Sequence, residues 1–424
     1  MHSLANFHAT NQFIKDARLE AVHARGCMAK LETAKRTSGF TESVIREMTR
    51  LANEHSAVNL SQGFPDFPAP DQVKSAACAA IIDDCNQYAI TWGDPVFRKT
   101  IANSFSQRYG VSVNPDTQVT VCCGATEAMV STLLACVNPG DEVIVFEPFY
   151  ESYGPDSILA GAVPRYVTLR EPHWTFDADD LAAAFNNRTK AIIINSPNNP
   201  TGKVFTREEL TVIAELCLQW GVLAITDEIY EHIVYDGTTH TPMAAIEGMS
   251  EQTVVINSMS KTFSVTGWRV GWAIAPEWLT NGIRKVHDFL TVGAPAPLQA
   301  AGVSALALPE QFYVDLAREY EGRRNLLLAV LERHGFTCYK PAGAYYIMTD
   351  IGKFSDDDVR FAKRLVEEVG VAAVPGSSFY HEAALGRTKL RFCFCKKEQT
   401  LREADRRLAM LSEEPIRQTS PTAL

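Results

Sequence analysis

The sequence predicts an α/β fold in which a mainly parallel β-sheet lies between layers of helices. Between about residues 118 and 275, short apolar runs with strand composition alternate with stretches that have helical spacing. The runs are apolar at consecutive positions, which is typical of strands covered by helices on both faces. After residue 297, a helical pattern over residues 310–333 is followed by shorter strand and helix signals that end near Leu411. This second region predicts a smaller α/β domain.

The expected elements follow in chain order. Apolar residues at Val44, Ile45, Met48 and Leu51 have the spacing of one helical face. Residues 58–70 combine a short apolar run with three prolines and are expected to form an irregular entry segment. Strands are expected at residues 119–121, 143–146, 191–194, 223–226, 254–256 and 272–274, and helices at residues 126–136 and 207–220.

The pattern also divides the chain into parts. The N-terminal segment is polar and mixed in charge, without an apolar core and cleavage site, so no signal peptide is expected. A polar segment with two prolines follows Leu411. The expected parts are an N-terminal extension at 1–37, an N-terminal arm or small-domain segment at 38–70, a large domain at 71–300, a small C-terminal domain at 301–411 and a flexible tail at 412–424.

Composition restricts the class of protein. A length of 424 residues allows two domains, and the net charge of −10 argues against nucleic-acid binding, because Lys and Arg are not in excess. No apolar run is long enough to cross a membrane. The ten cysteines include no Cys-x-x-Cys pair and have no histidine at zinc-ligand spacing. We therefore expect strand-buried free thiols, no metal, and a reducing, cytoplasmic location.

The most informative segment, residues 258–269, places Lys261 five residues after the end of the expected strand at 254–256. A lysine at the end of a buried strand loses hydration, which lowers the pKa of its amine and makes the amine nucleophilic toward carbonyls. The hydroxyl of Ser258 and the guanidinium of Arg269 suit a phosphate dianion. An amine and a phosphate site together predict a Schiff base with pyridoxal 5'-phosphate (PLP). On this segment alone, a solvated turn lysine beside a surface arginine is the alternative.

Asp227 and Tyr230 follow another expected strand, at 223–226. A buried acid there requires a cation or a hydrogen-bond donor, and a pyridinium nitrogen would be such a partner. Tyr230 could hydrogen-bond the ring oxygen of the same cofactor. The alternative for Asp227 is the solvated start of a helix.

Two more motifs follow expected strands. Asn199 lies in a turn, residues 195–202, that two X-Pro bonds and a glycine hold in an extended form, and its amide could donate to a phenolate oxygen. Gly124 precedes an expected helix, so the backbone N–H groups of Ala125 and Thr126 are candidates to hold a phosphate. An ordinary strand-to-helix turn is the alternative in both cases.

Arg391 is the last candidate. Alternation over residues 389–394 places it on one strand face with Lys389 and Cys393. Its guanidinium could bind a substrate carboxylate with two hydrogen bonds, and a salt bridge on an edge strand is the alternative. We expect this motif, like the others, to lie at the carboxyl end of a strand, where ligands collect in such sheets.

Together, these motifs resemble those of the fold-type I, class I/II PLP-dependent aminotransferases. The resemblance covers about residues 38–411, keeps the order of all the motifs, and includes Asn-Pro-Thr-Gly, Asp-x-x-Tyr and Ser-x-x-Lys with an arginine eight residues on. Residues 60–67 and 147–150 are most similar to the branch of kynurenine aminotransferase, glutamine transaminase K and bacterial methionine or aromatic aminotransferases. The implied fold is the PLP-dependent transferase fold (type I), α/β, with a large PLP-binding domain around a seven-stranded, mainly parallel sheet and a smaller α/β domain.

The resemblance also implies a role for each candidate residue. Lys261 would hold PLP as a Schiff base and then move the substrate's α-proton, while Asp227 would pair with the pyridine nitrogen. Asn199 and Tyr230 would bind the ring oxygen, and the α-carboxylate would bind Arg391 beneath the Gly63 region. The other implied cofactor contacts are Tyr150 stacked on the ring, and Ala125, Thr126, Ser258, Arg269 and, across a homodimer interface, Tyr88 at the phosphate.

The implied reaction transfers the amino group of a neutral or aromatic L-amino acid, of kynurenine, glutamine or methionine type, to a 2-oxo acid by a ping-pong mechanism. Residues 291–297 offer no arginine for a second carboxylate, which disfavours an aspartate-specific enzyme. The same scaffold supports β- or γ-elimination or replacement on cysteine conjugates or S-adenosylmethionine-type substrates, and the motifs do not separate these reactions. A PLP-binding regulatory protein is disfavoured, because residues 1–37 are too short for a DNA-binding module with its linker.

Overall fold

The structure is a computed structural model that describes residues 31–411. Residues 31–41 belong to a unit of their own, in which Lys35–Gly39 forms a 3₁₀ helix, η1, and all other elements belong to the unit that begins at Glu42. No helix of the described part is long and apolar enough to span a membrane. Most of the predicted extension and the whole predicted tail at 412–424 lie outside the described residues.

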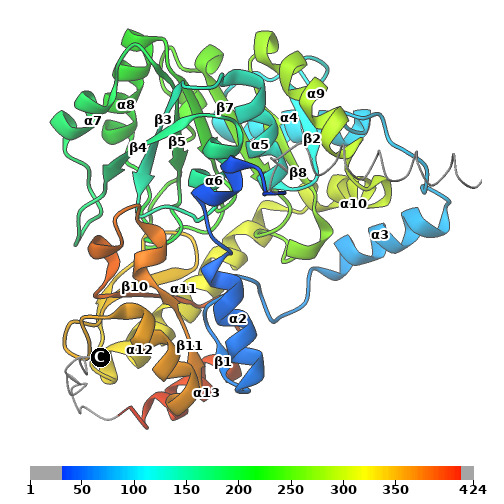
Figure 1. Cartoon of the computed structure of the whole chain (residues 1–424). Coiled ribbons are helices and arrows are strands. Elements are labelled where there is room, and N and C mark those ends of the chain that lie inside the picture. The colour runs from blue at the N-terminus through cyan, green and yellow to red at the C-terminus, as the bar shows by residue number, and fades with distance from the viewer. Residues whose placement is uncertain (1–30, 412–424) are drawn as a thin grey trace, which may run out of the picture. The chain divides into compact units, whose positions relative to one another are not determined.

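A seven-stranded sheet with the order β2-β8-β7-β6-β5-β3-β4 forms the centre of the larger unit (Figure 1). Strand β8 is antiparallel to β2 and β7, and the other pairs are parallel, so the sheet is mainly parallel as predicted. Its strands are β2 (Val119–Cys122), β3 (Glu142–Glu147), β4 (Val163–Thr168), β5 (Thr189–Asn195), β6 (Leu223–Asp227), β7 (Thr253–Ser258) and β8 (Gly271–Ile274).

The six predicted strands are present, and β4 is the one strand of this sheet that was not predicted. It lies at the sheet edge, is largely half-exposed, and carries Pro164 and Arg165 in place of a continuous apolar run. The predicted helices are confirmed as α5 (Ala125–Cys136), which begins one residue earlier, and α8 (Arg207–Trp220).

Helices cover both faces of the sheet. Ile193 packs in one cluster with side chains of α5, while its neighbours Ile192 and Ile194 pack in another cluster with side chains of α8. Because each face is buried, consecutive strand positions are apolar, which is the pattern seen in the sequence. The other helices around this sheet are α3 (Asp71–Ile82), α4 (Pro95–Tyr109), α6 (Tyr153–Leu159), α7 (Ala178–Ala184), α9 (Glu277–Thr291) and α10 (Ala296–Leu306).

A second, four-stranded antiparallel sheet follows in the sequence, with the order β12-β13-β10-β9. Its strands are β9 (Thr337–Tyr339), β10 (Tyr346–Asp350), β12 (Val374–Pro375) and β13 (Lys389–Cys393), accompanied by α11 (Glu310–Arg333), α12 (Asp358–Arg364) and α13 (Glu398–Leu408). Early residues join this region: β1 (Val58–Asn59) pairs in parallel with β11 (Val371–Ala372), and α2 (Val44–Glu54) packs in the same core cluster. The predicted domain boundaries themselves stay predictions.

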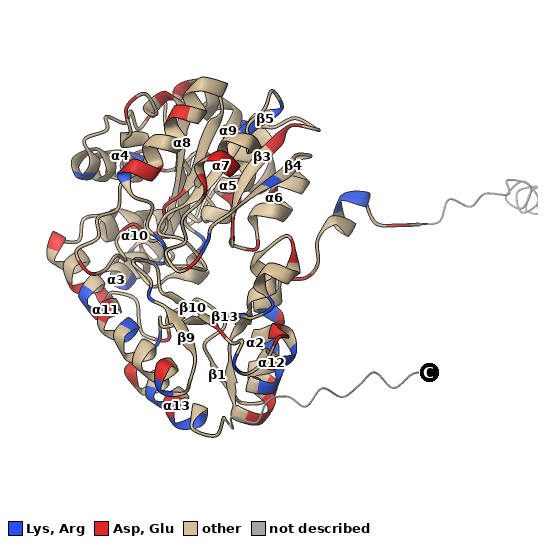
Figure 2. Cartoon of the chain, turned by 90° about the vertical axis from the view of Figure 1, so that its left-hand side faces the viewer, with Lys and Arg blue, Asp and Glu red and all other residues tan. Residues whose placement is uncertain are grey.

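The surface charges are mixed in sign, and of the two predictions about the cysteines one is confirmed and one is wrong. Acidic and basic residues are interspersed along α11 and α13, with pairs such as Arg323–Glu319 and Arg402–Glu398, and do not separate by sign there (Figure 2). The cysteines of the described part are free, as predicted. The prediction that they are buried in strands is wrong for Cys78 and Cys85, which are exposed, because Cys78 lies in the partly exposed helix α3 and Cys85 in the loop after it. It is also wrong for Cys136 and Cys217, which are buried in the helices α5 and α8.

Candidate active site

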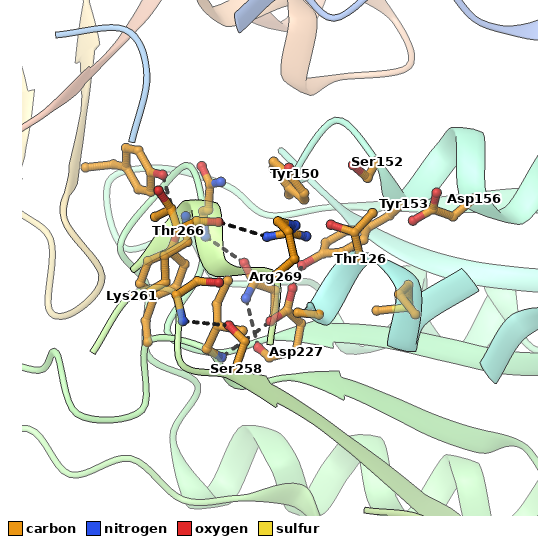
Figure 3. A pocket seen from close by; sticks show the side chains of 18 of the residues that line it. Thr126, Tyr150, Ser152, Tyr153, Asp156, Asp227, Ser258, Lys261, Thr266 and Arg269 are labelled. Atoms are coloured by element: carbon orange, nitrogen blue, oxygen red, sulfur yellow. Dashed lines mark hydrogen bonds between the residues drawn. The ribbon is translucent and has the colours of Figure 1, made fainter. Parts of the chain in front are cut away.

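A cavity of about 340 Å³ lies where β5, β6 and β7 reach their carboxyl ends. Figure 3 shows Lys261, Asp227 and Ser258 on one side of it, with Arg269, Thr126 and Tyr150 opposite. The predicted site residues that line the cavity are Ala125, Thr126, Tyr150, Asn199, Asp227, Tyr230, Ser258, Lys261 and Arg269. The fold therefore brings together motifs that are more than 100 residues apart in the chain.

Lys261 follows β7 and projects its amine among aromatic rings. Its Nζ donates to the carbonyl oxygen of Gly63 at 3.3 Å and lies 5.9 Å from the ring centroid of Tyr230 and 5.8 Å from that of Tyr345. Burial lowers the pKa of Lys261 from 10.5 to about 8. The negative charge of Asp227 opposes this change, because it favours the ammonium form. About one tenth of the amine is therefore neutral at pH 7. Lys261 lies in a turn but is half-buried among rings, so the alternative of a fully solvated turn lysine is wrong, whereas its surface arginine is correct in that Arg269 is exposed.

Asp227 ends β6 and is buried. Its Oδ2 accepts a hydrogen bond from the hydroxyl of Tyr153 at 2.8 Å. Burial raises the pKa of Asp227 from 3.8 to about 6, and the Tyr153 hydrogen bond opposes that rise. A cationic ring nitrogen beside it would favour the ionised carboxylate. The residues after Asp227 form turns, so the alternative of a solvated helix start is wrong.

Asn199 and Tyr230 present polar atoms near each other and near Arg391. The Oδ1 of Asn199 accepts from Nη1 of Arg391 at 2.8 Å, which leaves the Asn199 NH₂ group as a donor. The hydroxyl of Tyr230 lies 3.1 Å from that of Tyr346. The backbone N–H of Asn199 is held by Oδ1 of Asn195 at 2.7 Å, which fixes the turn. An amide and a phenol thus line the same cavity.

The start of α5, the end of β7 and Arg269 bring groups that suit an anion to the cavity. Gly124 has φ +87°, and a Cβ there would lie 2.4 Å from Nη2 of Arg269, so only glycine fits against this guanidinium. Gly271 in β8 is equally restricted, since a Cβ would lie 2.6 Å from the backbone nitrogen of Ala125. A helix N-terminus, the hydroxyl of Ser258 and an arginine thus all line the cavity, and this set of donors suits a phosphate.

Arg391 is fully buried in the antiparallel strand β13. The expectation that it lies at the carboxyl end of a strand is wrong: it is the third of five residues, in an inner strand, and the edge-strand salt bridge is wrong as well. Its Nη2 donates to the carbonyl oxygen of Ser61 at 2.6 Å, and its guanidinium lies 4.2 Å from the ring centroid of Tyr346. Its Nε has no hydrogen-bond partner among the described residues, so this donor is left for a further acceptor.

Three predicted residues do not line the cavity. Arg391 lies behind Asn199, and Gly63 contacts the site through its carbonyl, which also accepts from the hydroxyl of Tyr345 at 2.8 Å. A Cβ on Gly63 would overlap the hydroxyl of Tyr346 at 2.0 Å, so the backbone can approach this closely because the residue is glycine. Tyr88 is 87% exposed and contributes nothing to the cavity of its own chain.

The cavity also contains residues that the sequence did not single out. Tyr153, the first residue of α6, donates a hydrogen bond to Asp227. In the sequence, the feature that indicates it is its position three residues after Tyr150. Asp156 is buried in the cavity wall, and burial raises its pKa from 3.8 to about 7. Arg46 in α2 and Tyr346 in β10 also line the cavity. No local pattern marks these last three, because their place depends on how distant segments pack.

The donor set fits PLP. The cavity offers an amine with a lowered pKa for the aldehyde, a buried carboxylate for the ring nitrogen and an amide with a phenol for the ring oxygen. The helix N-terminus with Ser258 and Arg269 suits the phosphate.

Comparison with known proteins agrees with this chemistry. The family described as aminotransferase class I and II matches residues 55–408. The solved structure of N-succinyldiaminopimelate aminotransferase from Mycobacterium tuberculosis is 40% identical, with a TM-score of 0.87 over 90% of this chain and 100% of that one. The YbdL structure from Escherichia coli, described as having a methionine aminotransferase function, is 34% identical, with a TM-score of 0.86 over 90% of this chain and 100% of that one.

Kynurenine–oxoglutarate transaminase 1 of Homo sapiens is 37% identical over 416 residues, which cover 90% of this chain and 98% of that protein. These relatives confirm the predicted resemblance and fold, and with them the requirement for PLP. The chain therefore belongs to the class I and II aminotransferases, and it is a PLP-dependent enzyme that transfers amino groups between amino acids and 2-oxo acids.

Proposed function

We propose that the amino donor is a neutral or aromatic L-amino acid of kynurenine, glutamine or methionine type. The observation that carries this proposal is the aromatic lining of the cavity, to which Tyr150, Tyr230 and Tyr346 contribute and against which a large uncharged side chain can pack. The names of the human and Escherichia coli relatives, kynurenine–oxoglutarate transaminase and methionine aminotransferase, support the same class. The relatives found are named aminotransferases, so elimination or replacement is not favoured.

The proposed roles follow from the groups on each wall. When bound, PLP supplies a ring that withdraws negative charge from the substrate's α-carbon. We assign the movement of the α-proton to the amine of Lys261, because its lowered pKa keeps part of it neutral near pH 7. Asp227, held by Tyr153, would keep the proton on the ring nitrogen. The assigned phosphate ligands are the backbone of Ala125 and Thr126 with the side chains of Ser258 and Arg269.

Substrate positioning is assigned to the second sheet. Arg391 would bind the α-carboxylate through its unpartnered Nε side, while its contact with Asn199 couples that site to the donor for the ring oxygen. The Gly63 segment, held by Tyr345, would limit the space above the amine. Tyr150 would stack on the ring from the opposite wall.

We further propose a homodimer in which Tyr88 reaches the phosphate in a second copy. Tyr88 is highly exposed, and so are the nearby Ile90 and Val96 and, on α9, Phe289, which is 92% exposed. The two segments are adjacent, because a Cβ on Gly293 would lie 3.5 Å from the carbonyl oxygen of Thr91. An apolar surface of this kind is what a subunit interface covers.

The test is a panel of donors mixed with the PLP-loaded enzyme. Kynurenine, glutamine, methionine and phenylalanine are expected to discharge the visible band of the bound cofactor, and an added 2-oxo acid is expected to restore it. Lys261→Ala is expected to lower the rate at least about 10³-fold, whereas Lys285→Ala, at an exposed position of α9, is the matched control. A cofactor band that none of these donors discharges, or discharge by aspartate alone, would contradict the proposed donor class.

A further inference from the structure

Residues 60–64, which we call the carbonyl segment, lie beside Lys261 and form neither a helix nor a strand. Their backbone carbonyl oxygens therefore need hydrogen-bond donors from other parts of the chain, and each of the five has one. The donors are the backbone N–H of Cys393 for Leu60 at 2.8 Å, Nη2 of Arg391 for Ser61 at 2.6 Å, Nζ of Lys396 for Gln62 at 3.3 Å and for Phe64 at 2.8 Å, and Nζ of Lys261 with the hydroxyl of Tyr345 for Gly63.

Lys396 is a buried cation in this set of donors. The residue is only 2% exposed, and its ammonium group forms no ion pair with a carboxylate of the described residues. It binds two carbonyl oxygens and lies 4.0 Å from the ring centroid of Phe64. Burying an ammonium group is costly unless its hydration is replaced, and here carbonyl dipoles and the face of an aromatic ring replace it. All of these contacts go to the carbonyl segment.

The two carbonyl groups that Lys396 binds belong to the residues on either side of Gly63. One ammonium group bound to both restricts the backbone between them, and charge-assisted hydrogen bonds are the stronger kind. This part of the backbone is also closely packed, because a Cβ on Gly63 would lie 2.0 Å from the hydroxyl oxygen of Tyr346 and 2.9 Å from the ring of Tyr345. A small shift of the segment therefore changes the contacts of its neighbours.

The carbonyl segment contacts two residues that have roles in the proposed function. The carbonyl oxygen of Gly63 accepts from Nζ of Lys261, and that of Ser61 accepts from Nη2 of Arg391. The Ser61 contact occupies one side of the guanidinium and leaves its unpartnered Nε for a further acceptor. The position of the segment thus determines where the free donor of Arg391 points. Errors of about 1 Å in such positions are enough to weaken an active site strongly.

We propose that Lys396 is a positioning residue for the amino-transfer reaction: it binds the carbonyl oxygens of Gln62 and Phe64 and so holds the carbonyl segment where it orients Arg391 toward the substrate's α-carboxylate. Lys396 does not line the cavity, so it acts through the segment and not by touching substrate or cofactor. This inference rests on the role proposed for Arg391. It does not depend on the side chain of the amino donor.

The first measurement is hydrogen exchange of the peptide with residues 60–67 in the PLP-loaded protein. The segment contains protected amides, such as the N–H of Phe64, which donates to the carbonyl oxygen of Gln62 at 2.9 Å. Lys396→Met keeps an unbranched side chain of similar length but loses the charge, and is expected to speed exchange there about 10-fold or more. Lys397→Met, at the exposed neighbouring position, is the matched control and is expected to behave like the wild type.

The second measurement is the binding of two unreactive acids, propanoate and 3-phenylpropanoate, to the PLP-loaded protein. Lys396→Met is expected to weaken both about 10-fold, because Arg391 loses its orientation, and to change the dissociation constant of PLP less than about two-fold. Lys396→Arg keeps the charge and its donors, and is expected to recover most of the binding. A variant that is merely destabilised would lose affinity for the acids and for PLP together.

Phe64→Leu covers the case in which Lys396→Met does not fold. It removes the aromatic ring from the ammonium group at a residue that is 36% exposed, so the core stays intact. Both readouts are expected to move in the same direction as in Lys396→Met, but only about three-fold.

Unchanged exchange of residues 60–67 in Lys396→Met, or faster exchange with unchanged binding of both acids, would overturn the inference. Equal losses of affinity for the acids and for PLP, or the same effects in Lys397→Met, would overturn it as well. Failure of the proposed donor class is distinguishable. Wild-type protein that binds 3-phenylpropanoate no more tightly than propanoate would contradict an aromatic donor, while the effect of Lys396→Met on propanoate would still support the inference.

Discussion

Asp156 is a buried acid of the cavity wall whose Oδ2 has no hydrogen-bond partner among the described residues. Burial raises its pKa from 3.8 to about 7. Between these two values the folded state binds a proton that the unfolded state has released, so this residue makes stability fall as pH rises. Above about pH 7 the folded protein holds an unpaired buried charge, and the penalty stays constant.

We predict that Asp156→Asn removes this dependence. The free energy of unfolding of the variant is expected to exceed that of the wild type by an amount that grows by about 1 kcal/mol per pH unit between pH 5 and 7 and then levels off. Urea unfolding of both proteins at intervals across pH 5 to 8 measures the difference. A difference that does not change with pH would mean that Asp156 is ionised, or has an unseen partner, throughout.

Single residues also show what the sequence could reveal. Lys261, Asp227 and Asn199 were predictable because each lies within five residues after an apolar run, and the end of a parallel strand is a place where ligands bind. Arg391 was predicted for its guanidinium, yet its place in the middle of β13 was not. Arg46 and Asp156 were not predictable, because nothing in the chain near them indicates a cavity that forms only when α2, α6 and the central sheet pack together.

At the scale of elements, the junction of β2 and α5 determines whether the proposed phosphate site can form. Gly124 has φ +87° and ψ 166°, a conformation that side chains other than glycine rarely adopt, and it lies directly beneath the Arg269 guanidinium. Gly140 also has a positive φ, +91°, but no atom lies within 4 Å of the position of its Cβ. A substitution at Gly140 therefore introduces backbone strain alone, whereas one at Gly124 introduces strain together with a steric conflict with Arg269.

We predict that Gly124→Ala raises the dissociation constant of PLP about 10-fold or more, because Arg269 must move away from the phosphate. Gly140→Ala is expected to lower stability by about 1 kcal/mol through backbone strain and to leave cofactor affinity unchanged. Equilibrium dialysis of PLP against each apoenzyme, with thermal unfolding in parallel, measures both quantities. Equal losses of affinity in the two variants would show that strain alone is responsible.

Helix α9 links α5, the helix of the proposed phosphate site, to the exposed segment that contains Tyr88. Nδ1 of His287 lies 3.0 Å from a carboxylate oxygen of Glu127 in the first turn of α5, and its Nε2 lies 2.7 Å from the carbonyl oxygen of Thr91. Burial disfavours the charged imidazole, but the hydrogen bond and charge of Glu127 outweigh it and raise the pKa of His287. The group also includes the thiol of Cys122, within 4.8 Å, yet Glu127 already accepts from the backbone of Cys123. We interpret it as a structural brace between two parts of the site.

At the scale of the molecule, the sequence predicted the central sheet well and the second region coarsely. Strands buried on both faces leave continuous apolar runs, whereas the edge strand β4 and the two-residue strands β1, β11 and β12 leave no such signal. The pairing of β1 with β11 could not be predicted from the sequence either, because it joins residues more than 300 positions apart. It is this pairing that carries the N-terminal helix, and with it Arg46, to the cavity.

The proposed sharing of sites between two subunits gives the last prediction. If Tyr88 completes the phosphate site of a second copy, Tyr88→Ala and Lys261→Ala each damage a different chain's contribution to one site. Mixed and allowed to exchange subunits, the two inactive variants form hybrids in which one site has an intact Lys261 from one chain and an intact Tyr88 from the other. Random pairing makes half of the dimers hybrid, and each hybrid has one intact site of two, so activity is expected to recover to about a quarter of the wild-type value.

Activity is measured before and after subunit exchange. Each variant incubated alone is the control, and hybrid formation is followed by mass spectrometry of intact dimers. Hybrids that form without any recovery, or a Tyr88→Ala variant that is fully active alone, would mean that each chain completes its own site.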